Sequence, residues 1–548
     1  MAFIDPSAVP WPFPARMSLP VMSLSGGATS YFSSSGAVPH RARSRSHGML
    51  GLCALAIWVA AVRSPSFDTS SSDADEALFL LIGGHWLDGR LPYATIWDVK
   101  PPGLFAIFAL GQWAFGHGIV AARIISLLAV FATSCALFRF ARRHLGESIG
   151  AAAALLYPFY TLILYGLRSR PELLFAPLVV LGLDLAVAEW RRRASPDYHV
   201  VALSGLLFGL SVMIKQTAAF EALLAAGLVC TKPRVQGVER FHWRALLLFV
   251  LFGTLPSLGF LGYFALEGVE PSLYMAPFIG ASHRLSGDGI SFLGGVWRFL
   301  PMLKPILPLF LGMLLLATEW RSLDRSGDAI GIRVLGLWAL ASAAGVVAMR
   351  SMYFQYFLPL VPPFLLGSLV VIQTYLSRIE VWRSHTATAA VLGATLAAYP
   401  LVWLSSYERD DAAWTTLPTK IAENLRSAGM KPDDGLYVPD QETTIYLLAG
   451  AQIPTRFPQS QHLICDFSLP SIDQADEIRR IMASKPRFVV VAHDRPWMVC
   501  ERPDRMAIVD AALAESYTHQ ATVTDRNTAV DIYCRSGTCL GSKATRTP

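Results

Sequence analysis

The chain has 548 residues, of which 53% are hydrophobic and only 16% are charged. Because soluble domains carry about 25% charged residues, this composition excludes a disordered chain, a disulfide-rich secreted scaffold and an ordinary cytosolic enzyme, and it predicts a protein that crosses a membrane several times. The net charge of +6 is too small for this length to indicate a nucleic-acid partner.

Residues 1–48 are predicted to be a disordered arm, because Ser, Pro, Gly and Ala dominate most of it and no helical period is visible. The arm ends in a basic cluster that includes Arg41, Arg43 and Arg45. An apolar run, 49–65, follows this cluster. No small-residue cleavage site comes after the run, so we expect a first membrane helix rather than a removed signal peptide.

Further apolar runs continue to residue 405, several of them near the roughly 20 residues that cross a bilayer. Residues 49–405 are therefore predicted to form one all-α transmembrane domain of about eleven helices. The inner connections hold more Arg and Lys than the outer ones when the N-terminus is placed in the cytoplasm, as the positive-inside rule requires. The predicted spans after the first are 119–140, 148–165, 172–189, 199–214, 217–231, 245–266, 297–318, 334–349, 356–375 and 387–405.

Residues 406–548 change character and are predicted to form a small α/β domain. Its expected strands are Leu436–Val438, Phe488–Ala492 and Ala529–Tyr533, with a helix over Ile472–Met482. An odd number of spans places this domain outside the cytoplasm, where disulfides can form in three alternative pairings. No cysteine spacing suggests a metal site. The four cysteines concerned are Cys465, Cys500, Cys534 and Cys539.

The first predicted outer loop, 66–118, contains an acidic cluster made of Asp73, Asp75 and Glu76. Carboxylates beside a membrane are costly to desolvate, which favours a function such as a general base that accepts a proton from an attacking hydroxyl group. The alternative is a solvated loop in which Asp73 or Asp75 caps a helix. The residues alone leave both interpretations open.

Lys100 follows in the same loop, directly before Pro101 and Pro102, which stiffen the backbone after it. A lysine held at headgroup depth suits a lipid-linked phosphate, although an ordinary snorkelling lysine is an equal alternative. The short helix expected over 103–116 is predicted to lie along the interface with its aromatic residues facing lipid. These aromatic residues are Phe105, Phe108, Trp113 and Phe115.

The next outer loop offers a second group of candidates, in which Arg168 and Arg170 could grip a phosphate with two hydrogen bonds each. Glu172 follows in the first turn of the next span, where it would also complement the helix dipole. Lys215 lies in a tight outer turn and could add charge toward a phosphate, although interface anchoring is the simpler interpretation. The sequence contains no Gly-rich nucleotide loop, so no nucleotide cofactor is expected.

Taken together, these motifs resemble those of the GT-C glycosyltransferases, in the branch of protein O-mannosyltransferases, lipid A aminoarabinose transferases and lipopolysaccharide-core transferases. The resemblance is good over 49–175 and looser through 215 and over 350–375, and 406–548 is similar to the periplasmic domain that often ends such chains. The motifs that carry it are Asp75-Glu76, Gly89-Arg90-Leu91-Pro92-Tyr93, Lys100-Pro101-Pro102 and Ala121-Ala122-Arg123.

The resemblance implies a bacterial inner-membrane transferase that takes a sugar from a polyprenyl-phosphate donor and passes it to a periplasmic glycan, lipid or protein. It implies Asp75 as the base, with Asp73 as a second candidate, and no metal or cofactor. The sequence departs from the family at Gln355-Tyr356, where relatives often have His-Tyr. The residues implied at the site are Asp75, Glu76 and Glu172 for catalysis and Asp73, Tyr93, Lys100, Arg168, Arg170 and Lys215 for binding.

Two other classes of function compete with a transferase. A transporter or lipid flippase would be expected to show internal repeats and broken helices near the membrane centre, and the sequence contains no convincing repeat. A noncatalytic membrane subunit would be expected to lack the acidic pair at Asp75 and Glu76.

Overall fold

The computed structural model describes residues 40–67, 73–192, 195–231, 241–279, 292–324, 329–349, 353–377, 396, 398–402, 416–467, 469–470, 472–493, 502–525 and 528–538. The predicted arm up to residue 39, most of the predicted span 387–405, Cys500 and Cys539 lie outside this part of the chain. Residues Met1–Gly51 and Leu52–Pro548 form two units, and the second unit contains every candidate site residue.

The described part of the second unit is mostly helical up to residue 402. Within the described ranges of the whole chain, five helices are long and apolar enough to cross a membrane, namely Gly48–Phe67, Ile119–His144, Pro171–Arg191, Trp243–Leu266 and Phe354–Thr374. Most of the other predicted spans are shorter apolar helices here, so the chain is a multi-pass protein whose total of eleven spans stays a prediction. The helices are α1 (His40–Arg63), α2 (Ala74–Leu87), α3 (Pro102–Phe115), α4 (Ile119–His144), α5 (Glu147–Leu162), α6 (Pro171–Arg191), α7 (Tyr198–Ile214), α8 (Ala219–Cys230), α9 (Trp243–Leu266), α10 (Pro271–Ile279), α12 (Phe292–Met302), α13 (Leu307–Asp324), α14 (Ala329–Ala348) and α15 (Val361–Ser377).

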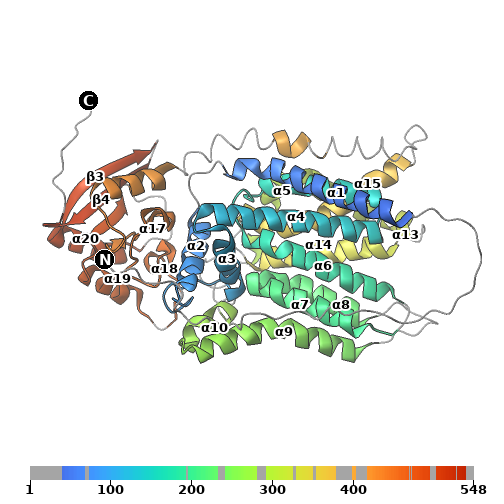
Figure 1. The fold of residues 1–548 in the computed structure, drawn as a ribbon, viewed down its shortest axis with the longest axis horizontal. Helices are drawn as coiled ribbons and strands as arrows, with labels where there is room; N and C mark the ends of the chain where they lie inside the picture. The colour runs from blue at the N-terminus through green and yellow to red at the C-terminus, as the bar shows by residue number, and fades with distance from the viewer. Residues whose placement is uncertain are drawn as a thin grey trace, which may run out of the picture. The chain divides into compact units, whose positions relative to one another are not determined.

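The long helices pack in neighbouring pairs. Helix α4 lies beside α5 and α6, and α7 lies between α6 and α9 (Figure 1). Small residues allow the closest approach, because a Cβ added at Gly205 or Gly209 of α7 would overlap the backbone of α9. This is the usual packing solution for membrane helices, which gain no hydrophobic driving force from the surrounding lipid.

Helix α3 differs from its predicted orientation. Phe105 and Phe108 are buried, whereas Trp113 and Phe115 are exposed. The reason is that α3 packs against α2, where the Phe79 and Phe108 rings lie 5.4 Å apart edge to face. The prediction that all four aromatic residues face lipid was therefore wrong for the first two.

The C-terminal region contains a four-stranded sheet of order β1-β2-β4-β3, formed by β1 (Leu436–Tyr437), β2 (Phe488–Ala492), β3 (Tyr517–Asp525) and β4 (Thr528–Arg535). Strand β1 runs parallel to β2, and the other pairs are antiparallel. The three predicted strands are present, but β3 was missed because it contains no apolar run and begins with three consecutive polar residues after Tyr517, namely Thr518, His519 and Gln520. The helices of this region are α17 (Thr444–Ala449), α18 (Ser460–Ile464), α19 (Gln474–Ala483) and α20 (Pro503–Ser516).

Trp97 joins the loop after α2 to the C-terminal region. Its backbone N–H donates to the Arg456 carbonyl oxygen at 2.7 Å, and its indole N–H donates to the Leu273 carbonyl oxygen at 3.0 Å. The His462 ring packs edge-on against the indole at 5.1 Å. A fully buried tryptophan of this size fixes the three segments that it contacts, and Lys100 follows only three residues later.

Candidate functional site

The acidic cluster lies at the start of α2. Asp73 is the N-cap residue of this helix, and its Oδ1 accepts a hydrogen bond from the Glu76 backbone N–H at 2.9 Å. Its Oδ2 forms an ion pair with Arg170 and lies 4.0 Å from Nε of Arg168. The capping role considered for Asp73 is therefore confirmed, and the same side chain also contacts the second outer loop.

Asp75 is the most accessible carboxylate of the three, with 31% of its side chain exposed against 17% for Asp73 and none for Glu76. Its Oδ2 lies 3.5 Å from Nη1 of Arg170. Burial lowers the pKa of Arg170, but the surrounding carboxylates outweigh burial and raise this pKa above its ordinary value. Arg170 is thus a fixed positive charge between the two aspartates.

Glu76 is completely buried and forms an ion pair with Arg123 of α4. The same Oε1 atom accepts a hydrogen bond from the Ser169 backbone N–H at 2.8 Å. These contacts tie α2 to α4 and to the loop before α6. A carboxylate so enclosed favours a positioning role, so the catalytic role predicted for Glu76 has less geometric support than that of Asp75.

Lys100 has its own set of contacts within the first outer loop. Its Nζ lies 3.4 Å from Oδ2 of the buried Asp98 and 5.4 Å from the centre of the Phe79 ring. Tyr93 has a positive φ of 67°, and its hydroxyl group donates to the Lys100 carbonyl oxygen at 2.8 Å. Tyr93 therefore holds the Lys100 turn through the backbone, and burial raises the pKa of its phenol well above the ordinary value.

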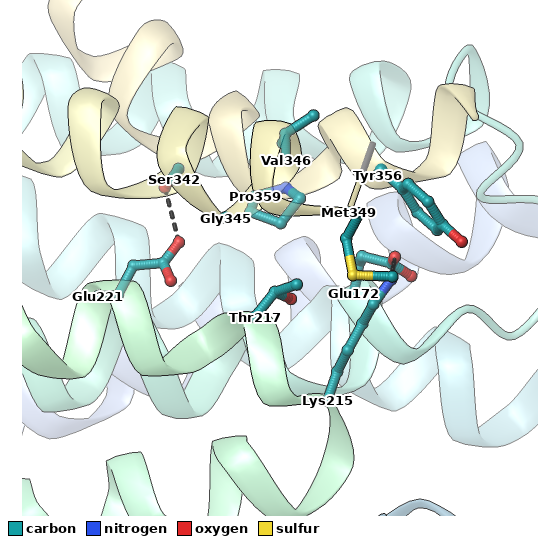
Figure 2. A pocket seen from close by; sticks show the side chains of 10 residues that line it. All are labelled: Glu172, Lys215, Thr217, Glu221, Ser342, Gly345, Val346, Met349, Tyr356 and Pro359. Atoms are coloured by element: carbon teal, nitrogen blue, oxygen red, sulfur yellow. Dashed lines mark hydrogen bonds and ion pairs between the residues drawn. The ribbon is translucent and has the colours of Figure 1, made fainter. Parts of the chain in front are cut away.

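Glu172 and Lys215 form a buried ion pair between the start of α6 and the end of α7. The Nζ atom of Lys215 also lies 3.9 Å from the centre of the Tyr356 ring. Both residues line a pocket with about 250 Å³ of space not filled by atoms, part of which is open (Figure 2). The pocket is lined by Glu172, Lys215, Thr217, Glu221, Ser342, Gly345, Val346, Met349, Tyr356 and Pro359.

The predicted residues do not line one cavity. Two of the charged groups that they form are Asp73 and Asp75 with Arg168 and Arg170, and Glu172 with Lys215, whereas Glu76 and Lys100 pair separately with Arg123 and Asp98. Glu172 contributes to the electrostatic field at Arg170, which links the groups. The Lys100 turn is attached to the second group, because the side-chain amide of Gln216 donates to the carbonyl oxygens of Val99 at 3.3 Å and Pro277 at 2.6 Å.

Of the residues that line this pocket, Glu172 and Lys215 were predicted as site residues, whereas Tyr356, Glu221 and Ser342 were not. In the structure, the hydroxyl group of Ser342 donates to Oε1 of Glu221 at 2.7 Å, on the side of the pocket away from Lys215 (Figure 2). A buried carboxylate inside an apolar helix is by itself a signal for a functional site, and this signal could have identified Glu221.

The chain matches a known family over part of its length. The family described as dolichyl-phosphate-mannose-protein mannosyltransferase matches residues 99–260. This segment begins one residue before Lys100 and contains Arg168, Arg170, Glu172 and Lys215. It does not include the acidic cluster at the start of α2.

A curated relative is similar to a part of this chain. The undecaprenyl phosphate-alpha-4-amino-4-deoxy-L-arabinose arabinosyl transferase of Edwardsiella ictaluri (strain 93-146) is 28% identical over 260 residues. The match covers 45% of this chain and 46% of the relative, so the chain spans less than half of the length of that protein.

Two solved structures share the fold along nearly the whole chain. ArnT from Cupriavidus metallidurans in the apo state is 16% identical, with a TM-score of 0.60 over 89% of this chain and 98% of its own. The same protein bound to undecaprenyl phosphate is 15% identical, with a TM-score of 0.63 over 91% of this chain and 100% of its own. The resemblance predicted from the sequence is therefore confirmed by the family match over residues 99–260, and along nearly its whole length the chain has the fold of this ArnT.

Proposed function

We propose that the chain is an integral-membrane glycosyltransferase that moves a sugar from a polyprenyl-phosphate donor to a periplasmic acceptor, with Asp75 as the general base. The acceptor is a glycan, a lipid or a protein, and the chemistry needs no metal ion. The C. metallidurans ArnT of the same fold has been solved with undecaprenyl phosphate bound, which supports this class of donor.

The observation that supports the proposal most is the meeting of charges from separate turns. Asp75 of α2 lies beside Arg170 of the second loop, and Lys215 reaches Glu172 at the start of α6. A phosphate that leaves as an anion must be stabilised by fixed positive charges, and buried guanidinium and ammonium groups provide them without reorganisation. Arg168, Arg170, Lys100 and Lys215 are the groups available for this purpose.

In the proposed reaction, Asp75 accepts the proton of an acceptor hydroxyl or amine group. The acceptor atom forms a bond to the anomeric carbon of the sugar, while the bond from that carbon to the donor phosphate breaks. The electron pair of the broken bond leaves with the phosphate. Asp75 is favoured over Asp73 and Glu76 because its side chain is the most exposed of the three, and a base must reach its substrate.

The finer topology belongs to the same proposal. Residues 1–48 form a cytoplasmic arm, 49–405 form the transmembrane domain with its first periplasmic loop at 66–118, and 406–548 form a periplasmic α/β domain of a bacterial inner-membrane protein. Cys465 and Cys534 each take part in a disulfide bond. These bonds fit an oxidising compartment for residues 406–548.

The direct test is to incubate the purified full chain with a panel of prenyl-phosphate sugars and to measure release of the free prenyl phosphate. We expect Asp75→Asn to lower this release at least about 100-fold, because general-base catalysis typically contributes a factor of about 10²–10⁴. The matched control is Asp88→Asn, which removes a carboxylate that is half exposed and pairs only locally with Arg90. Unchanged release by Asp75→Asn would remove this residue from the role, and release from no donor in the panel would contradict the donor class.

A further inference from the structure

The opposite ends of α4 and α6 carry a second charged cluster, which the proposed transfer reaction does not use. Arg139 lies 16 residues after Arg123 on α4, a separation of about 24 Å at 1.5 Å per residue. The stretch 124–138 between them contains no charged residue, so it spans apolar depth. The cluster therefore lies where the hydrocarbon region ends on the other side of the bundle from the candidate site.

One buried carboxylate organises this cluster. Asp184 of α6 is completely buried, and its Oδ2 accepts hydrogen bonds from Nε of Arg139 at 2.7 Å and Nη1 of Arg143 at 3.0 Å. Its Oδ1 lies 3.0 Å from Nε2 of His144, whose Nδ1 lies 3.3 Å from Nη1 of Arg191. His144 therefore lies between the carboxylate of Asp184 and the guanidinium group of Arg191.

The carboxylate fixes the arginines without covering them. The side chains of Arg139 and Arg143 are 49% and 43% exposed, whereas that of Asp184 is not exposed at all. Arg139 contacts Asp184 through its Nε. The ranges 139–147 and 184–192 contain five arginines and three carboxylates, and one of these arginines, Arg192, pairs with Asp197 at 2.9 Å.

We infer that this cluster, defined as Arg139, Arg143, Arg191, His144 and Asp184, is a binding site for the headgroup phosphate of an anionic phospholipid. Guanidinium groups bind phosphate oxygen atoms with paired, charge-assisted hydrogen bonds, and here their geometry is fixed before a ligand arrives. Basic pockets between membrane helices at headgroup depth are suited to such lipids. The ordinary excess of arginine at one membrane face does not require a buried carboxylate that holds the arginines together.

The test measures lipid binding to the purified full chain by native mass spectrometry, with phosphatidylglycerol, phosphatidylcholine and inorganic phosphate as separate probes. We expect phosphatidylglycerol to bind at least about 10-fold more tightly than phosphatidylcholine, because its phosphate carries a net negative charge that the choline group of phosphatidylcholine neutralises within the same headgroup. The variant Arg139→Gln/Arg143→Gln should abolish this preference. The control Arg479→Gln/Arg502→Gln removes the same amount of charge from exposed positions of the C-terminal region. This control variant should retain the preference for phosphatidylglycerol.

A second variant separates binding from folding. Arg139→Lys/Arg143→Lys keeps the charge but loses the planar guanidinium groups, so the preference should fall without disappearing. Equal binding of the two lipids by the unchanged protein would overturn the inference, as would an unchanged preference in the double glutamine variant. Inorganic phosphate that binds as tightly as phosphatidylglycerol would overturn the assignment to a lipid headgroup. None of these measurements depends on the transferase reaction.

Discussion

The two ends of the helix bundle use charge in opposite ways. At the candidate site, Glu76 with Arg123 and Glu172 with Lys215 are buried pairs in which each carboxylate faces a cation. At the other end, the buried Asp184 contacts two arginines, Arg139 and Arg143, whose side chains stay about half exposed. The charged groups at the candidate site therefore have a fixed internal geometry. The Asp184 cluster instead presents positive charge to its surroundings.

Removing the central carboxylate at each end is the strongest way to test this comparison. Glu76→Gln leaves Arg123 buried beside a neutral group and should destabilise the protein by about 3–5 kcal/mol, the range for a broken buried pair. Asp184→Asn should have a smaller effect, because its arginine partners reach solvent or headgroups. Thermal unfolding midpoints of the two variants provide the measurement, and equal losses would contradict the comparison.

The fixed geometry of the first end also depends on Trp97, which connects the Lys100 turn to the C-terminal region. Trp97→Ala should cost about 3–5 kcal/mol through lost burial and should expose the C-terminal region to proteolysis. Trp113→Ala is the matched control, because that indole is exposed. If both variants resist protease equally, Trp97 does not hold the two regions together.

Within the first end, Lys215 is expected to contribute to ligand binding as well as to internal pairing. Lys215→Met should weaken binding of undecaprenyl phosphate about 10- to 100-fold, because a hydrogen bond to a charged group contributes about 1.5–3 kcal/mol. The double variant Glu172→Gln/Lys215→Met avoids an unpaired buried carboxylate and should bind as weakly while remaining folded. Normal affinity in the double variant would restrict Lys215 to a structural role.

The smallest expected effect lies in the sheet of the C-terminal region, outside both ends. Burial alone would raise the pKa of Asp531, but hydrogen bonds from Thr522, His493 and His519 lower it below its ordinary value. The stability that Asp531 contributes is therefore present above the unfolded pKa of about 3.9 and is lost as the pH falls through the folded value. Asp531→Asn should show a shallower loss of thermal midpoint between about pH 5 and pH 3 than the unchanged chain.

Much of the helical framework could be predicted from the sequence, because apolar runs and their charged flanks determine where helices begin and end. The predicted span 119–140 corresponds to α4, and 172–189 corresponds to α6. The packing of α3 could not be predicted, since burial of Phe105 depends on α2. Strand β3 was missed because its pairing with β4, rather than an apolar run, stabilises it.

The candidate site was predictable in its residue types but not in its pairs. The motif that includes Asp75 and Glu76 indicated an acidic cluster, yet nothing local in the sequence distinguishes an exposed aspartate from a buried glutamate paired 47 residues away. The same holds for Lys215, whose partner Glu172 is 43 residues distant. Long-range pairs of this kind depend on how the helices pack, which a single sequence does not determine.

The position of bound undecaprenyl phosphate in an electron cryomicroscopy map of the purified chain tests the central claim most directly. We predict phosphate density within hydrogen-bonding distance of Lys100, Lys215, Arg168 or Arg170, with Asp75 facing the same space. Phosphate density remote from all four cations, at saturating ligand, would contradict the account.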